Sequence, residues 1–273
     1  MRIIVLSTEN QWEINRIRQE AAKRGHPVKT IHPAKLKPSQ LKGSDALLIR
    51  AVRGHAAKAA AIARKALEKG LVVVDERLAK SGGRDKAANY LVLEKAGVRV
   101  PPTFVASEKE ANRLFKLSFK ELVIKPLHGK RGEGVVKCKR SGLRKALSRF
   151  YGKYDEAIVQ PFLHVSNEYR VLVVGGKALG AFEKKARGWR HNVSTGAKPK
   201  KTRLTRRMRE LAVKAASAVG TEVGGVDIAR AGGRFYVLEV NRSPQFKGFE
   251  SSTNKNVALE IVEYLERKAE ANA

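Results

Sequence analysis

Two oxygen-bearing side chains, Glu239 and Asn241, stand two positions apart where the apolar run YVLEV ends and the turn NRSP begins. Residues i and i+2 of a β-strand lie on the same face, so both side chains can contact one object. Asp227 lies in the preceding run, GGVDIAR, across a short turn at residues 231–233. Facing residues of adjacent antiparallel strands are about 5 Å apart, which adds a third oxygen ligand. Two carboxylates and an amide predict a site for Mg²⁺, and Mn²⁺ accepts the same ligands.

An ion pair is the alternative interpretation of these carboxylates, because Arg230 and Arg242 are close in the sequence. Asn241 favours the metal, since an amide adds nothing to a salt bridge. The six histidines and the single cysteine, Cys138, show no metal-ligand spacing. The expected metal is therefore held by oxygen atoms.

A glycine-rich loop, KPLHGKRGEGVV at residues 125–136, is the second feature suited to chemistry. Gly129, Gly132 and Gly134 allow close approach of the backbone to a ligand, and Lys125 is one of several cations suited to phosphate. The loop lacks the Lys-Ser/Thr of a P-loop, and a strand follows it where a dinucleotide fingerprint has a helix. The pattern predicts a lid over phosphates, with a cationic surface hairpin as the alternative.

The net charge of +30, from 56 Lys and Arg against 26 Asp and Glu, indicates an anionic partner. Residues 184–214 hold twelve of the basic residues and one acidic residue, Glu210. An anionic acceptor substrate and a nucleic acid both fit this segment, and a solvated face is the third interpretation. Trp189 is its one aromatic residue, which weakens a base-stacking mode of nucleic-acid binding.

The elements that position these residues alternate between strand and helix, which predicts an α/β protein. Residues 1–82 are predicted to form an N-terminal parallel α/β domain that ends at the linker-like SGGRDK. Residues 83–163 would form a central subdomain with the glycine-rich loop, and residues 164–273 a C-terminal subdomain with the metal site. No apolar run of about 18 residues is present, so a cytoplasmic protein without membrane contact is expected.

The chain resembles the RimK-like branch of the ATP-grasp ligases over nearly its whole length. The resemblance rests on RDKAANYLVLEKAGVRVP, VIKPLHGKRGEGVV, IVQPFL, NEYRVLVVGGKALGAFEKKA and GGVDIARAGGRFYVLEVNRSPQFKGFE, which occur in family order. It implies an ATP-grasp fold behind a pre-ATP-grasp domain. It also implies an enzyme in which ATP phosphorylates a carboxylate and an amine attacks the acyl phosphate, giving an amide, ADP and phosphate.

The resemblance also implies a role for each matching residue. Lys86 and Lys125 would bind the ATP phosphates under the loop formed by Gly129, Gly132 and Gly134. Gln160, Phe162 and Leu163 match the strand end that holds adenine, and Glu168 would lie near the ribose. Arg170 could hold the acyl phosphate, and Arg190 and Asn192 match a stretch near the phosphates. Asp227, Glu239 and Asn241 match the magnesium ligands.

Two departures from the family pattern affect specificity. QPFL stands where a glutamate commonly follows the glutamine, and Pro161 removes a backbone donor near the adenine. NRSPQFKGFE combines the Ser-Pro of the glutamate ligases with a Phe-Lys of the LysX-like carrier-protein ligases. The expected activity is ligation of an amino acid, glutamate first, to an acidic protein tail, a carrier protein or a polyglutamyl cofactor. A nucleic-acid-binding protein on the same scaffold is the alternative, and a homo-oligomer is expected.

Overall fold

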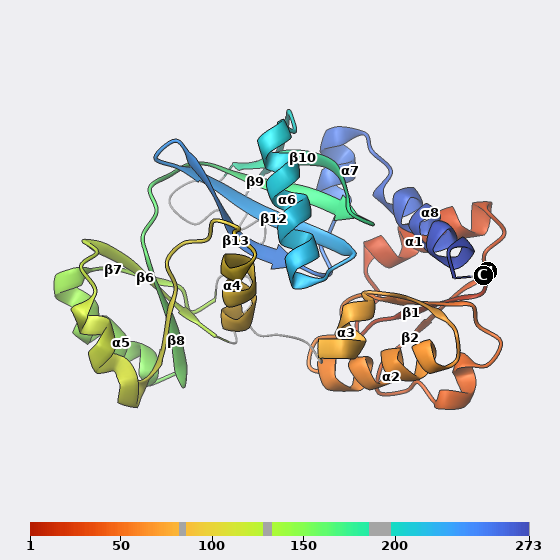
Figure 1. Cartoon of the computed structure of the whole chain (residues 1–273), viewed down its shortest axis with the longest axis horizontal. Helices are drawn as coiled ribbons and strands as arrows, with labels where there is room; N and C mark the ends of the chain where they lie inside the picture. Colours follow the sequence, from red (N-terminus) through yellow and green to blue (C-terminus); the bar gives the residue numbers. More distant parts are fainter. Residues whose placement is uncertain (82–85, 128–132, 186–197, 273) are drawn as a thin grey trace.

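Three β-sheets form the core of the chain in a computed structural model that describes residues 1–81, 86–127, 133–185 and 198–272 (Figure 1). The five-stranded sheet lies in the middle, with a four-stranded sheet on either side of it. No helix of the described residues combines the length and the apolar character needed to cross a membrane. This mixture of helices and sheets agrees with the α/β class expected from the sequence.

The first sheet is parallel throughout, with the strand order β2-β1-β3-β4. Strands β1 and β3 are buried along their whole length, as expected for continuous apolar strands with helices on both faces. The elements of this part are β1 (Ile3–Leu6), α1 (Trp12–Lys23), β2 (Val28–Ile31), η1 (Pro38–Leu41), β3 (Ala46–Ile49), α2 (Ala56–Glu68), β4 (Val72–Val74) and α3 (Glu76–Ser81).

The last helix of the chain, α8 (Val257–Glu270), packs beside α1 on the first sheet (Figure 1). Its side chains Ile261 and Leu265 are fully buried in the same hydrophobic cluster as Ile3 and Val5. One face of the N-terminal sheet is therefore covered by the C-terminal end of the protein.

The second sheet is antiparallel, with the strand order β5-β8-β6-β7. Residues 108–116 form the 3-10 helix η2. Ala111 and Leu114, three residues apart, are its buried residues, which suits the 3-10 repeat of three residues per turn. The elements are β5 (Phe104–Ser107), η2 (Glu108–Lys116), β6 (Glu121–Pro126), β7 (Val136–Lys139), η3 (Arg140–Gly142), α5 (Leu143–Tyr151) and β8 (Glu156–Pro161).

The third sheet is also antiparallel, with the order β11-β10-β9-β12-β13. Strands β9 and β10 form a hairpin that turns at Gly175 and Gly176, whose φ angles of 54° and 77° favour glycine. Strand β11 lies within the basic segment of residues 184–214, where the sequence analysis predicts no strand. The elements are α4 (Lys86–Lys95), β9 (Val165–Val174), β10 (Lys177–Lys185), β11 (Lys198–Thr202), α6 (Arg206–Val219), β12 (Val223–Ala231), β13 (Arg234–Asn241) and α7 (Lys247–Thr253).

Candidate active site

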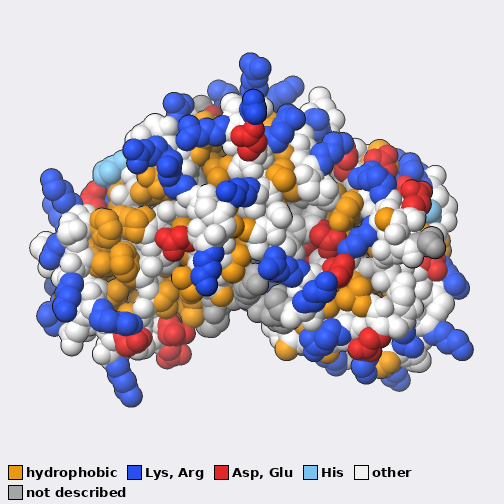
Figure 2. Space-filling model, in the orientation of Figure 1, with side chains coloured by type: hydrophobic (Ala, Val, Ile, Leu, Met, Phe, Trp, Pro, Cys, Tyr) orange, Lys and Arg blue, Asp and Glu red, His pale blue; other side chains and the backbone are white. Residues whose placement is uncertain are grey.

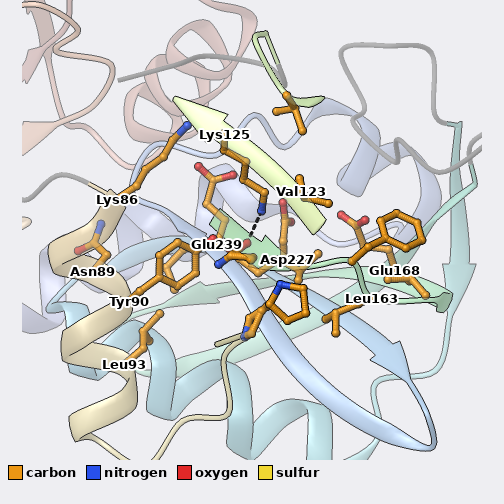
Figure 3. Close-up of a pocket in the computed structure, with 18 residues that line it drawn as sticks. Lys86, Asn89, Tyr90, Leu93, Val123, Lys125, Leu163, Glu168, Asp227 and Glu239 are labelled. Carbon is orange, nitrogen blue, oxygen red and sulfur yellow. Dashed lines mark hydrogen bonds between the residues drawn. The ribbon is translucent and has the colours of Figure 1, made fainter. Parts of the chain in front are cut away.

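A cavity of about 230 Å³ lies between the second and third sheets, with α4 along one side (Figure 3). It is lined by charged side chains from four strands and one helix, which are far apart in the sequence. Eight of the residues singled out from the sequence contribute to its lining: Lys86, Lys125, Gln160, Phe162, Leu163, Glu168, Asp227 and Glu239.

The two carboxylates at the floor of the cavity come from neighbouring strands. Asp227 of β12 pairs directly with Glu239 of β13, and a bulge follows, because Ile228 pairs with Val237 and Leu238 is left as the extra residue. Asn241 pairs with Gly225, two residues further toward the exit of β13. The short turn and the two-residue spacing therefore place all three side chains along one end of the hairpin.

Asp227 lies in a buried cluster of two cations and two anions. The Arg170 guanidinium donates from Nε to Oδ1 at 2.7 Å and from Nη2 to Oδ2 at 2.8 Å. Lys184 Nζ donates to Asp227 Oδ2 and to Glu168 Oε1, each at 2.6 Å. Burial opposes the charge of Asp227, but Arg170 and Lys184 outweigh it and lower the pKa of the carboxyl to about 2. The carboxylate is therefore ionised at neutral pH.

Lys184 is a member of this buried cluster that the sequence analysis did not single out. It is 2% exposed and lies on β10 two positions after the buried Phe182, so both side chains point to the same face of the sheet. The available signal was this alternation, which places a lysine at a core position of a strand. Lys184 neutralises the two carboxylates from adjacent strands.

The oxygen atoms that the hairpin carries are of the kind that a hard cation prefers. A carboxylate has about four lone-pair sites. Three hydrogen bonds reach Asp227, which leaves capacity on Oδ1. Asn241 Oδ1 accepts the Ser243 N–H at 3.0 Å and keeps a second lone pair. Glu239 is exposed to the cavity, so Mg²⁺ could bind these three residues with its remaining sites open to water and substrate.

Two lysines provide positive charge in the same cavity as the carboxylates. Lys125 Nζ donates to Gln160 Oε1 at 2.7 Å, and Gln160 Nε2 donates to Thr103 Oγ1 at 2.8 Å, so a buried amide orients the ammonium group. Burial lowers the pKa of Lys86, with Glu239 opposing and Lys125 adding to this effect. Figure 3 shows Lys86 and Lys125 on opposite sides of Glu239. Ammonium groups placed in this way suit an anionic phosphate.

The other residues that the resemblance assigns to the site lie in different surroundings, and some of them lie outside the described part of the chain. Phe162 N–H donates to Glu121 O at 2.9 Å, and Lys137 Nζ lies 3.5 Å from the centre of the Phe162 ring. Gly134 has φ 70°, and a Cβ there would lie 2.5 Å from the Tyr154 hydroxyl, so glycine is required. Arg170 contacts Asp227 and does not line the cavity. Four residues lie outside the described part of the chain: Gly129, Gly132, Arg190 and Asn192.

Comparison with known proteins assigns the family. The RimK-like ATP-grasp domain matches residues 83–265. A relative named probable alpha-L-glutamate ligase, from Serratia proteamaculans, is 30% identical over 98% of this chain and 96% of its own length. A relative of the same name from Vibrio vulnificus is 31% identical over 100% of this chain and 98% of its own length.

Solved structures share the fold. The ATP-grasp ligase PsnB, complexed with the precursor peptide PsnA2 and AMPPNP, aligns with a TM-score of 0.76 and 19% identity over 98% of this chain and 97% of its own. The D-alanine–D-alanine ligase of Bacillus anthracis, complexed with ATP, aligns with a TM-score of 0.69 and 17% identity over all of both chains. The sequence match, the fold and the cavity agree, and the chain belongs to the RimK-like ATP-grasp ligases, a family of ATP-dependent carboxylate–amine ligases.

Proposed function

We propose that this ligase adds an amino acid, glutamate, to a carboxyl-bearing anionic acceptor through an acyl phosphate, with release of ADP and phosphate. The observation that carries the proposal is that Lys86, Lys125, Asp227 and Glu239 line one cavity. Cations suited to phosphate and oxygen ligands suited to magnesium are what phosphoryl transfer to a carboxylate needs. The relatives named alpha-L-glutamate ligase support glutamate as the added amino acid.

The chain's own residues would act by binding and orientation. Lys125, held by Gln160, and Lys86 would bind the ATP phosphates, so that the terminal phosphoryl group faces the acceptor carboxylate. Asp227, Glu239 and Asn241 would hold Mg²⁺, which would supply neutralising charge for the transferring phosphoryl group. The amine would then attack the acyl carbon, forming the amide bond as the carbon–oxygen bond to phosphate breaks. Arg170 and Lys184 keep Asp227 ionised and fixed.

The acceptor is a peptide or protein carboxylate in this proposal. Structural neighbours of the chain include PsnB with its precursor peptide and the macrocyclase MdnC bound with the precursor peptide MdnA. An acidic protein tail or a carrier protein would suit the basic charge of the chain, and so would a polyglutamyl compound.

Trapping the intermediate tests the reaction type. With ATP, magnesium and a tetraglutamate peptide, the protein should convert hydroxylamine to a hydroxamate of the peptide without added amino acid, because hydroxylamine attacks an acyl phosphate. The hydroxamate and ADP would be measured by mass spectrometry and a coupled assay. Formation of AMP and pyrophosphate in place of ADP would show adenylation and refute the proposal.

Lys125→Ala should weaken ATP binding by about tenfold to a hundredfold, the range expected for a lost charge-assisted hydrogen bond of about 1.5–3 kcal/mol. Titration calorimetry with ATP and magnesium measures the effect. Lys139→Ala is the matched control, because Lys139 is an exposed lysine of the adjacent strand β7. Equal ATP affinity in Lys125→Ala and wild type would remove Lys125 from the nucleotide site.

The KM for tetraglutamate should rise with ionic strength while kcat stays constant, because surface cations raise the local concentration of an anionic acceptor. Lysine and arginine side chains are scattered over the visible face, and several of them lie near its upper edge, around α6 (Figure 2). Replacing Lys198, Lys200 and Lys201 of β11 together by glutamine should flatten this dependence. The same replacement at Lys35, Lys65 and Lys69, on the N-terminal part, removes equal charge as a control.

The nucleic-acid alternative makes a different prediction in the same salt series. RNA or DNA affinity would fall linearly on a log–log plot against salt, with a slope set by the phosphates contacted. A filter-binding titration, run alongside the kinetic measurements, distinguishes a nucleic-acid partner from an anionic peptide acceptor. Tight nucleic-acid binding with a salt-insensitive KM for tetraglutamate would overturn the anionic-peptide acceptor.

A further inference from the structure

The carboxyl edge of the first sheet has the topology of a ligand site. In the order β2-β1-β3-β4, the chain moves outward from β1 to β2, then crosses back to β3 and continues to β4 on the other side. Open parallel sheets bind ligands outside the carboxyl ends of their strands, at the point where the strand order reverses. That point lies between β1 and β3, and Arg50 is the first residue after β3.

Arg50 is buried with incomplete hydrogen bonding. The residue is 3% exposed, and its Nη2 donates to Pro244 O at 2.9 Å. Its Nε and Nη1 have no acceptor among the described residues. Buried donors of a charged group cost free energy when they lack an acceptor, so such a group in a native protein calls for an explanation.

A second partnerless donor lies next to the residue that Arg50 contacts. Ser243 Oγ is buried and has no hydrogen-bond partner within the described part of the chain. Ser243 precedes Pro244, so the unsatisfied hydroxyl and the unsatisfied guanidinium nitrogens belong to one small region where the first sheet meets the loop after β13.

This region continues directly into the candidate active site. The loop after β13 follows Asn241, whose Oδ1 accepts the Ser243 N–H. Pro244 packs on Gly225 of β12, where a Cβ would lie 2.8 Å from the Pro244 Cβ and 3.5 Å from the Arg170 Cδ. Arg50 therefore lies behind the strand ends that carry the predicted magnesium ligands, on the side of the N-terminal sheet.

We propose that Arg50 and Ser243 form a carboxylate-binding subsite, which holds a carboxylate of the amino acid or of the acceptor at the junction with the first sheet. This inference rests on the proposed ligase function. A guanidinium group binds carboxylates through charge-assisted hydrogen bonds, and a serine hydroxyl adds one more donor. Glu13 and Asp75 interact electrostatically with Arg50, and their negative charges oppose a doubly charged phosphate more strongly than a singly charged carboxylate.

Two substitutions test the subsite through their effects on the melting temperature and on the binding of the carboxylate substrates. Ser243→Ala removes a donor that lacks an acceptor, so its melting temperature should stay the same or rise, whereas Arg50→Met also removes the hydrogen bond to Pro244 O. The KM of one carboxylate substrate should rise about tenfold or more, as expected for lost charge-assisted hydrogen bonds, while the KM for ATP stays constant. A rise for L-glutamate assigns the amino-acid carboxylate, and a rise for tetraglutamate assigns the acceptor. Arg53→Met is the matched control, because Arg53 is an exposed arginine of the same loop.

The proposal is overturned if Arg50→Met lowers the melting temperature and leaves both KM values unchanged, because Arg50 would then only join the N-terminal sheet to the Pro244 loop. If Arg50→Met does not fold, the variants Ser243→Ala and Arg50→Lys test the subsite in its place. Unchanged KM values for both carboxylate substrates in both of these variants would also overturn the proposal.

Equilibrium binding separates this inference from the proposed function. Calorimetric titration of L-glutamate and of tetraglutamate into the full chain needs no turnover. If wild type releases no ADP with these substrates, the ligase proposal for them fails. Loss of binding in Arg50→Met, with retention in Arg53→Met, would still support the subsite, and equal binding in all three proteins would refute it.

Discussion

The Glu239→Gln variant is expected to fold normally and to lose about a thousandfold or more of kcat/KM, since a catalytic metal stabilises the transition state by several kcal/mol. Glu239 is exposed to the cavity, so the change removes one charge and leaves packing intact. ADP release with L-glutamate and tetraglutamate measures turnover, and titration calorimetry with Mg²⁺ measures the metal.

Glu94→Gln is the matched control for this variant. Glu94 is an exposed glutamate on α4, the helix that also carries Lys86, and it does not line the cavity. Wild-type turnover of Glu239→Gln at low magnesium concentration would remove Glu239 from the metal site. Chelation of magnesium should abolish turnover of wild type and control alike.

Lys184→Met is expected to lower the free energy of unfolding by about 3–5 kcal/mol, the cost of removing one partner from a buried ion pair. The substitution leaves Glu168 and Asp227, 7% and 5% exposed, with Arg170 as the remaining cation of the cluster. Denaturant unfolding of the two proteins gives the difference. The double variant Lys184→Met/Glu168→Gln removes one charge of each sign and should regain part of the lost unfolding free energy. If Lys184→Met is as stable as wild type, Lys184 does not stabilise the buried cluster.

Acid unfolding gives a second measurement on the same cluster. The pKa of Asp227 is lowered from 3.8 to about 2 in the folded protein, so its contribution to stability is complete above the unfolded value and is lost as the pH falls through this range. Removing Lys184 raises the pKa of Asp227 toward its ordinary value. The acid transition of Lys184→Met should therefore begin at a higher pH than that of wild type.

Local patterns in the sequence were sufficient to predict the hairpin that carries the predicted metal ligands. Asp227 and Glu239 lie on two apolar runs separated by a short turn, and a turn of that length leaves few registers for the two strands. The alternation of side chains along a strand then indicates which residues share a face. These are short-range properties, so sequence reasoning could reach them.

Long-range pairing was the part that sequence reasoning could not reach. The partners of Lys184 depend on β9 lying between β10 and β12, which no local pattern specifies. Strand β11 was missed because three of its five residues are lysine and one is proline, a composition typical of loops. The packing of α8 against β1 likewise depends on contacts between residues more than 200 positions apart.

The position of α8 has a consequence for how the protein is made. Val74, the last residue of the first sheet, and Val257, the first residue of α8, are 183 residues apart in the chain. At about 5–20 residues per second, a ribosome needs roughly 10–40 s to synthesise this interval. During that time the strands of the N-terminal sheet have left the ribosome without the helix that covers one of their faces. The nascent chain therefore carries an uncovered apolar surface until its last residues emerge.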